Sequence, residues 1–218
     1  HEAYPGRVID VGIAEAEAVA SAAGMAYQGA HPVVALYATF LNRGFDQLLM
    51  DVALHRAGVT FVLDRAGVTG ADGASHNGVW DIAMCSMIPG LRLAAPRDEE
   101  TLRARLREAL DVDDAPTVIR YRKGSLPEPM PALRSVGGVD ILFDEVVADS
   151  SARVLIVGTG ACAPDAIEAA RRLAADGVSV TVADPQWMIP ISSDLATLAG
   201  DYDCVVSVED GIVQGGFG

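Results

Sequence analysis

The chain has 218 residues, half of them hydrophobic, and a formal net charge of -14. This length suits one large domain, or one domain with part of a second, and such an acidic chain is not expected to bind a nucleic-acid backbone. No apolar run reaches the roughly 18 residues of a membrane helix, and no signal peptide is recognisable. We therefore expect a cytoplasmic protein that has no membrane or nucleic-acid partner.

Short apolar runs alternate with helical stretches along the first half of the chain. In chain order we expect a strand end at Val8–Val11, a helix at Glu15–Gln28, a buried strand at Pro32–Tyr37, a helix at Arg43–Leu54, a strand at Val59–Leu63, a turn-rich loop at Asp64–Gly78, a short helix at Trp80–Cys85, a strand at Leu91–Ala94, a helix at Asp98–Leu110 and a strand at Thr117–Tyr121. These strands are runs of Val, Ile and Leu without alternation. Both of their faces should therefore be covered, as in a parallel α/β sheet.

A proline-rich stretch ends this pattern after Lys123. We expect residues 124–150 to be a linker with one short strand at Val139–Leu142. A second α/β unit follows, with strands expected at Arg153–Val157, Val178–Ala183 and Cys204–Val208 and helices at Pro164–Asp176 and Asp194–Ala199. The chain is accordingly divided into residues 1–123, 124–150 and 151–218. Its abrupt ends suggest a fragment of a longer protein.

The three cysteines, Cys85, Cys162 and Cys204, are widely spaced and lie in apolar stretches. We expect them to be buried free thiols in a reducing compartment. No pair of Cys or His residues has the spacing of metal ligands, so no metal site is predicted within this chain.

One glycine-rich turn has two interpretations. The segment Gly158-Thr-Gly160-Ala-Cys-Ala163 follows a strand, and Asp184 ends the next strand at the spacing of a dinucleotide-binding fingerprint. Against this reading, Asp165 would place an anion beside the cofactor phosphates, and few residues follow Asp184. A tight turn in an α/β sheet is the simpler interpretation. A dinucleotide-sensing module is the non-enzymatic alternative for the whole chain.

Polar and aromatic side chains gather directly after the predicted strands of the first half. Each one alone could be a turn residue or, for Glu15, a first-turn acid favoured by the helix dipole. Ligands of open α/β sheets bind outside the carboxyl ends of the strands, where loops often carry function. We therefore predict a site there, formed by Glu15, Tyr37, Phe40, Arg65, Asp72 and His76.

The motifs that contain these residues resemble those of the 1-deoxy-D-xylulose-5-phosphate synthase family, in the same order and spacing over nearly the whole chain. They are Gly12-Ile-Ala-Glu15, Tyr37-Ala-Thr-Phe40-Leu, Asp46-Gln47, Asp51-Val-Ala-Leu54, Asp64-Arg-Ala-Gly67, Gly70-Ala-Asp-Gly73 and His76. The resemblance implies an α/β fold: a parallel-sheet pyrimidine-binding domain of thiamine-diphosphate enzymes, followed by part of a transketolase C-terminal-like domain. It also implies that the full-length transferase is a homodimer. That enzyme would decarboxylate pyruvate and transfer the two-carbon unit to glyceraldehyde 3-phosphate, giving 1-deoxy-D-xylulose 5-phosphate for isoprenoid and thiamine biosynthesis.

The resemblance implies a role for each matching residue. Glu15 would hydrogen-bond the N1′ atom of the cofactor aminopyrimidine, and Phe40 would pack against that ring. The implied catalytic residues are Glu15, Tyr37, Arg65, Asp72 and His76; the cofactor-binding residues are Glu15, Phe40 and Ile13; the substrate-phosphate residues are Lys123, Arg122 and Arg65. Lys123 stands where the family has an arginine, and it can bind phosphate as a point charge.

Two features depart from the family. After Glu15 the family has Gln-His, whereas this chain has Ala16-Glu17. A carboxylate at Glu17 would disfavour ionisation of Glu15 if the two share a site, unless Glu17 points away. The Gly-Asp-Gly segment that holds the diphosphate and its Mg²⁺ is absent here and belongs to an N-terminal domain in the synthases. We therefore expect this chain alone to be inactive. The alternative enzyme is a split transketolase-like or 2-oxo-acid dehydrogenase enzyme, of which this chain would be the C-terminal subunit.

Overall fold

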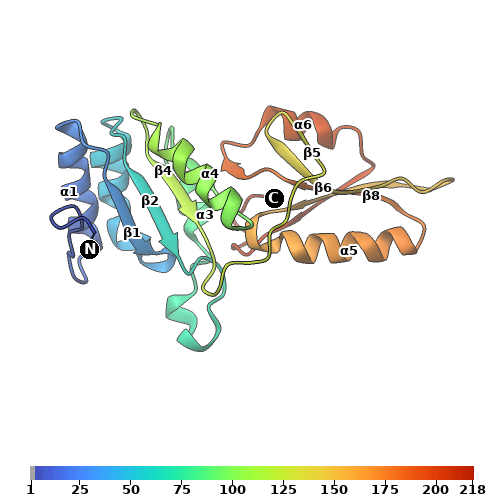
Figure 1. Ribbon diagram of the computed structural model, residues 1–218, viewed down its shortest axis with the longest axis horizontal. Helices are drawn as coiled ribbons and strands as arrows, with labels where there is room; N and C mark the ends of the chain where they lie inside the picture. The colour runs from blue at the N-terminus through green and yellow to red at the C-terminus, as the bar shows by residue number, and fades with distance from the viewer. Residues whose placement is uncertain (1–2) are drawn as a thin grey trace.

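The structure, a computed structural model, describes residues 3–218. These residues form two five-stranded sheets with helices packed against them (Figure 1). The first sheet has the order β1 (Val33–Tyr37), β2 (Thr60–Asp64), β4 (Thr117–Arg120), β3 (Arg92–Ala94) and β9 (Trp187–Ile189). The second has the order β10 (Cys204–Val208), β7 (Arg153–Gly158), β8 (Ser179–Asp184), β6 (Val139–Glu145) and β5 (Arg134–Val136). The predicted α/β class is confirmed.

Six α-helices accompany the sheets in the described residues: α1 (Glu15–Tyr27), α2 (Phe45–Gln47), α3 (Asp81–Ser86), α4 (Glu99–Leu110), α5 (Ala163–Ala175) and α6 (Ser193–Ala199). Helices α5 and α6 lie on opposite faces of the second sheet (Figure 1). Helix α4 begins at a capping box, because the Asp98 carboxylate accepts from the Thr101 amide and the Thr101 hydroxyl accepts from the Asp98 amide. No helix in residues 3–218 is long and apolar enough to cross a membrane.

The first half follows the predicted order, with three corrections. Strands β1, β2, β4 and β3 pair in parallel as expected. Residues Val8–Val11 form no strand and are exposed. Strand β1 is partly exposed rather than buried, because it lies at the edge of the sheet. The predicted helix at Arg43–Leu54 is divided into a 3₁₀ segment (Ala38–Gly44), α2 and a π-helical segment (Leu48–Ala53).

The second half departs further from the prediction. The strand expected at Val139–Leu142 is confirmed and extends to Glu145 as β6, whereas β5 was not predicted within the linker at 124–150. Strand β6 pairs antiparallel with β8, so the second sheet is mixed. Strand β9 was not predicted, and it pairs antiparallel with β3 of the first sheet. Its three residues stand between Pro185 and Pro190, which leaves a segment too short for a periodic pattern. The second half of the chain thus completes the first sheet.

The cysteines are free thiols, but they are not all buried. Cys85 and Cys162 are buried, as expected. Cys204 is exposed, because it begins β10 at the open edge of the second sheet.

The glycine-rich turn after β7 serves packing between the two halves. Gly160 has φ +50°, and a β-carbon there would lie 2.9 Å from the Ala95 carbonyl oxygen. A β-carbon on Gly158 would lie 2.6 Å from Cβ of Ala166. Asp184, the candidate ribose ligand, is completely buried and accepts a hydrogen bond from Arg97 at 2.8 Å. This geometry agrees with a tight turn. Because Asp184 is buried and bonded to Arg97, it cannot bind the ribose of a dinucleotide.

Arg97 joins the two halves through buried carboxylates. Its Nη1 atom lies 2.8 Å from both Asp184 Oδ2 and Asp140 Oδ2, and its Nε donates to the Met130 carbonyl at 2.9 Å. Burial raises the pKa of Asp184 to about 6 and outweighs the lowering effect of Arg97; repulsion from Asp140 adds to the rise.

Because its pKa is raised, Asp184 should make the protein more stable as the pH falls. Its folded pKa of about 6 exceeds the ordinary value of 3.8, so the folded state holds an extra proton between these values. That stabilisation, at most about 3 kcal/mol, is complete below the ordinary pKa and is lost as pH rises through the folded pKa. Relative to Asp184→Asn, the wild-type protein should gain unfolding free energy as the pH falls from about 7 to about 4.5, measured by urea denaturation. A difference that does not change with pH would contradict this assignment.

Candidate functional site

The candidate site lies where β1 and β2 end. Tyr37 and Asp64, the last residues of these parallel strands, are register partners, so the loops that follow start side by side. The loop after β2 is closed at its base by two backbone hydrogen bonds between Gly67 and Gly78, of 2.7 and 2.9 Å. The Thr39 hydroxyl, in the segment after β1, donates to the Ser75 carbonyl at 3.0 Å. The two loops therefore form one surface at the carboxyl edge of the sheet.

Four of the predicted residues form an aromatic cluster on this surface. The rings of Tyr37 and Phe40 are stacked with centroids 6.0 Å apart, and the His76 ring meets Phe40 edge-on at 5.5 Å. The Arg65 guanidinium lies 3.9 Å from the centroid of the Tyr37 ring. A cation over an aromatic face is favourable and fixes the orientation of both groups. The sequence motifs thus lead to one contiguous cluster.

Arg65 carries an unused hydrogen-bonding capacity. Its Nε atom is buried and has no acceptor within the described part of the chain. The nearest carboxylate oxygens, from Asp64 and Asp72, are each 3.9 Å away, beyond hydrogen-bond distance. A buried donor without a partner is costly. Arg65 also has φ +62°, a conformation that few non-glycine residues adopt. Both features are typical of functional positions.

Lys123, the only lysine in the sequence, reaches the same loop from the end of β4. Its Nζ atom lies 2.8 and 2.7 Å from the two carboxylate oxygens of Asp72. The hydrogen bond from Lys123 lowers the pKa of Asp72, which therefore stays ionised. Lys123 and Arg65 thus flank one carboxylate, so two cations face the same small region of an otherwise acidic chain.

Glu15 is linked to the cluster by a residue that was not among the predicted site residues. Its side chain is only 12% exposed, and Oε2 lies 3.4 Å from Nη1 of Arg43. The Arg43 guanidinium also lies 4.7 Å from the centroid of the Phe40 ring. Gly44 lets this segment approach α1, since a β-carbon there would lie 2.8 Å from the Val19 side chain. The signal for Arg43 was its place three residues after Phe40, in the segment that follows β1.

Two predicted residues do not join the cluster. Ile13 is 89% exposed. Arg122 turns towards the second half, where its Nε donates to Asp210 at 3.0 Å and its Nη2 lies 3.1 Å from Cys162 Sγ. Of the three cations predicted to bind the substrate phosphate, Lys123 and Arg65 therefore lie at the site. The roles of Ile13 and Arg122 stay predictions.

The structure shows where the side chain of Glu17, which differs from the family's histidine, lies. The Glu17 side chain is exposed and accepts a hydrogen bond from the Ser21 hydroxyl at 2.9 Å. Residues two apart on a helix do not face each other. Glu17 thus points away from Glu15, which is the second of the two arrangements considered from the sequence.

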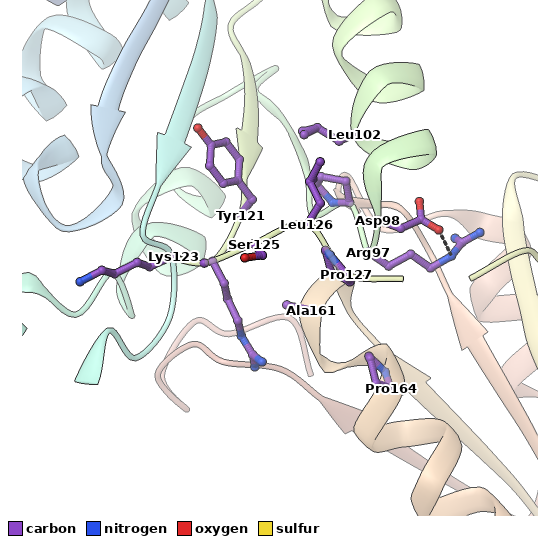
Figure 2. A pocket seen from close by; sticks show the side chains of 13 residues that line it. Arg97, Asp98, Leu102, Tyr121, Lys123, Ser125, Leu126, Pro127, Ala161 and Pro164 are labelled. Carbon is purple, nitrogen blue, oxygen red and sulfur yellow. Dashed lines mark ion pairs between the residues drawn. The ribbon is translucent and has the colours of Figure 1, made fainter. Parts of the chain in front are cut away.

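An apolar pocket of about 400 Å³ lies beside the site, between the chain that follows β4 and the glycine-rich turn. Its lining includes Leu102, Tyr121, Leu126, Pro127, Ala161 and Pro164. Lys123 also lines the pocket, and Figure 2 shows its side chain extending away from Leu126 and Pro127. The pocket and the cluster at the ends of β1 and β2 are therefore neighbours, with Lys123 at the boundary between them.

The cluster fits the pyrimidine side of a thiamine cofactor. The Glu15 carboxylate has a single ion-pair partner, so lone pairs remain for a ring nitrogen, and Phe40 supplies an aromatic surface within reach of the same arginine. These groups lie at the carboxyl ends of the parallel strands β1 and β2, where ligands of open α/β sheets bind. The chain belongs to the transketolase family: residues 1–129 match the transketolase pyrimidine-binding domain, and residues 145–218 match the transketolase C-terminal domain.

Curated relatives confirm the predicted resemblance. Over 219 aligned residues the chain is 58% identical to 1-deoxy-D-xylulose-5-phosphate synthase 2 of Kitasatospora griseola, covering 100% of this chain and 35% of that protein. It is 54% identical to 1-deoxy-D-xylulose-5-phosphate synthase of Corynebacterium glutamicum (strain R), covering 99% of this chain and 34% of the relative. The chain thus spans about a third of the length of these relatives.

Solved structures agree on the fold. A split gene transketolase, described as an inactive beta4 tetramer, superposes with a TM-score of 0.83 at 28% identity and covers 99% of this chain and 69% of its own. Transketolase from Leishmania mexicana gives a TM-score of 0.78 at 22% identity, covering 92% of this chain and 30% of that one. At 22% identity, the likeness to the Leishmania mexicana transketolase shows a shared fold alone.

Proposed function

We propose that this chain forms the pyrimidine side of the active site in a longer, thiamine-diphosphate-dependent 1-deoxy-D-xylulose-5-phosphate synthase. That transferase would act in the cytoplasm as a homodimer, taking pyruvate as donor and glyceraldehyde 3-phosphate as acceptor. One observation carries the proposal: Glu15, Tyr37, Phe40, Arg65, Asp72, His76 and Lys123 meet in a continuous set of contacts at one edge of the sheet. The identity of 54–58% to named synthases supports it.

The chain's own residues would hold and orient the reacting groups. Thiamine diphosphate, when bound, supplies the electron-accepting ring that decarboxylation and two-carbon transfer need. Glu15, shielded from water and held by Arg43, can share a proton with a ring nitrogen of the pyrimidine. Phe40 packs on that ring, and His76 beside it can hold or give a proton at the acceptor oxygen.

The diphosphate and Mg²⁺ require residues beyond this cluster. Within residues 3–218, no group of three or more His, Cys, Asp or Glu side chains is arranged to hold a metal ion. We propose that a further part of the longer protein holds them. An isolated 218-residue chain should then show no product in a pyruvate and glyceraldehyde 3-phosphate assay, and its calorimetric binding of thiamine diphosphate should be weak or absent. Turnover by the isolated chain would refute this division of the site.

Substitution of Lys123 tests whether the site binds a phosphorylated acceptor. In the full-length protein, Lys123→Met should raise the KM for glyceraldehyde 3-phosphate about 10- to 100-fold, because a charged hydrogen bond contributes about 1.5–3 kcal/mol. The KM for pyruvate should stay within about twofold. Lys123→Arg is the matched control and should retain phosphate binding, since it keeps the charge. Equal effects of Lys123→Met on both substrates would contradict the assignment.

The split-enzyme alternative is favoured by one observation. The split gene transketolase chain is matched over 69% of its length, whereas the synthases are matched over about a third. A native polypeptide about 1.4 times as long as this chain, as in the split gene transketolase, would support a separate subunit if an immunoblot detected it. A polypeptide of the synthases' length would support the synthase.

A further inference from the structure

One carboxylate from the second half of the chain reaches the base of the candidate site. Asp210 follows β10 and is nearly buried. Its Oδ1 accepts from Nη1 of Arg120 at 2.6 Å, and its Oδ2 accepts from Nε of Arg122 at 3.0 Å. Arg120 ends β4, and Arg122 directly precedes Lys123. Asp210 therefore fixes, at two points, the segment that carries the phosphate-binding lysine.

The same carboxylate lies against the base of the loop after β2. A β-carbon on Gly67 would lie 2.3 Å from Asp210 Oδ2, so only glycine leaves room for this approach. Gly67 has φ +78° and forms the two backbone hydrogen bonds with Gly78 that close the loop. The loop that carries Asp72 and His76 thus rests on Asp210.

Adjacent contacts hold the segment after β10 in place. The Ile212 amide donates to the Val79 carbonyl at 2.9 Å, and a β-carbon on Gly215 would lie 3.1 Å from that of Ala83. Burial acts to raise the pKa of Asp210, but Arg120 and Arg122 outweigh it and lower the pKa, so Asp210 remains an anion. A charged and anchored group between two site segments can set their separation.

We propose that Asp210 is a positioning residue that holds Lys123 and the Arg65–Gly78 loop at the separation an acceptor phosphate requires. It acts through Arg120, Arg122 and Gly67 and touches no substrate itself. The inference rests on the proposed function of the site. It gives the second half of the chain a role in positioning the site residues.

Kinetics of the full-length protein provide the first test. Asp210→Asn should raise the KM for glyceraldehyde 3-phosphate roughly tenfold, since small misplacements of binding groups are costly. The KM for pyruvate should change by less than about twofold. Asp184→Asn is the matched control, because it removes another buried carboxylate that joins the halves through an arginine; it should leave both KM values near wild type. The proposal is overturned if Asp210→Asn leaves the KM for glyceraldehyde 3-phosphate unchanged, or if it changes both KM values equally.

A second variant covers the case in which Asp210→Asn does not fold. Asp210→Glu keeps the charge, but its side chain is longer and should displace Gly67, because the Asp210 carboxylate already lies against that glycine. It should raise the same KM selectively, and a wild-type KM for glyceraldehyde 3-phosphate would overturn the proposal.

Amide hydrogen exchange separates this inference from the proposed function, because it needs no catalysis. Asp210→Asn should speed exchange in residues 65–78 and 121–127, and Asp184→Asn should not. Unchanged exchange there in Asp210→Asn would overturn the positioning role even in an active synthase. If the wild-type protein makes no 1-deoxy-D-xylulose 5-phosphate, the proposed function fails, and faster exchange in Asp210→Asn alone would still support the positioning role.

Discussion

Replacement of Arg120 by methionine should lower the free energy of unfolding by about 3–5 kcal/mol, because it leaves the buried Asp81 carboxylate without its ion-pair partner and removes one of the two partners of Asp210. The Arg120 side chain is 3% exposed and lies 2.7 Å from Asp81 and 2.6 Å from Asp210. Asp81 has no exposed surface at all. Burial acts to lower the pKa of Arg120, but Asp81 and Asp210 raise it above its ordinary value, so the guanidinium stays charged when folded. Chemical denaturation would measure the loss.

Arg103→Met is the matched control for this substitution. Arg103 pairs with Glu99 at 2.7 Å on the surface of α4, where the two side chains are 65% and 50% exposed. Exposed pairs contribute only about 0–1 kcal/mol, since water and salt screen them. A loss at Arg120 no larger than that at Arg103 would show that the buried cluster does not hold the halves together.

Glu15→Gln should reduce the kcat of the full-length protein by about 10²- to 10⁴-fold, the usual contribution of a proton-transferring group. The amide keeps the size of the side chain and can still approach Arg43, but it cannot take up a proton at neutral pH. The effect should fall on turnover, while the midpoint of thermal unfolding should change little. Steady-state kinetics together with calorimetry would separate these two effects.

Glu17→Gln on the same helix is the control for Glu15. Its side chain is exposed and bonded to Ser21, so turnover should stay within about twofold of wild type. Comparable losses at both positions would mean that turnover depends on the charge of the helix and not on the Glu15 carboxylate.

Local patterns were sufficient for much of this fold. Strands β2, β4, β7 and β8 contain short, mostly apolar stretches with clear boundaries, and α4 starts at a capping residue. The carboxyl-end rule predicted that the polar residues after successive strands would gather at one edge of the first sheet. The family motifs then assigned individual residues to it, and most of them meet there.

The remaining features depend on contacts between distant residues. Arg120 and Asp210 are 90 residues apart in sequence, so no local pattern pairs them. Arg122 was expected at the phosphate site, but its partner Asp210 was not visible from the motif. Strand β5, with three residues, and strand β9 are defined by their neighbours rather than by their own sequences. The exposure of Cys204 likewise follows from the place of β10 in the sheet order.

Strand β9 limits how the chain can be divided. Because β9 pairs with β3, residues 1–123 alone would present β3 as an unpaired edge, with its backbone donors and acceptors free to join another sheet. A separately expressed first half should therefore tend to self-associate. Exchange of second halves between relatives would need an incoming segment that supplies this short strand in the same register. The two halves are distinct in layout, but they are not interchangeable modules.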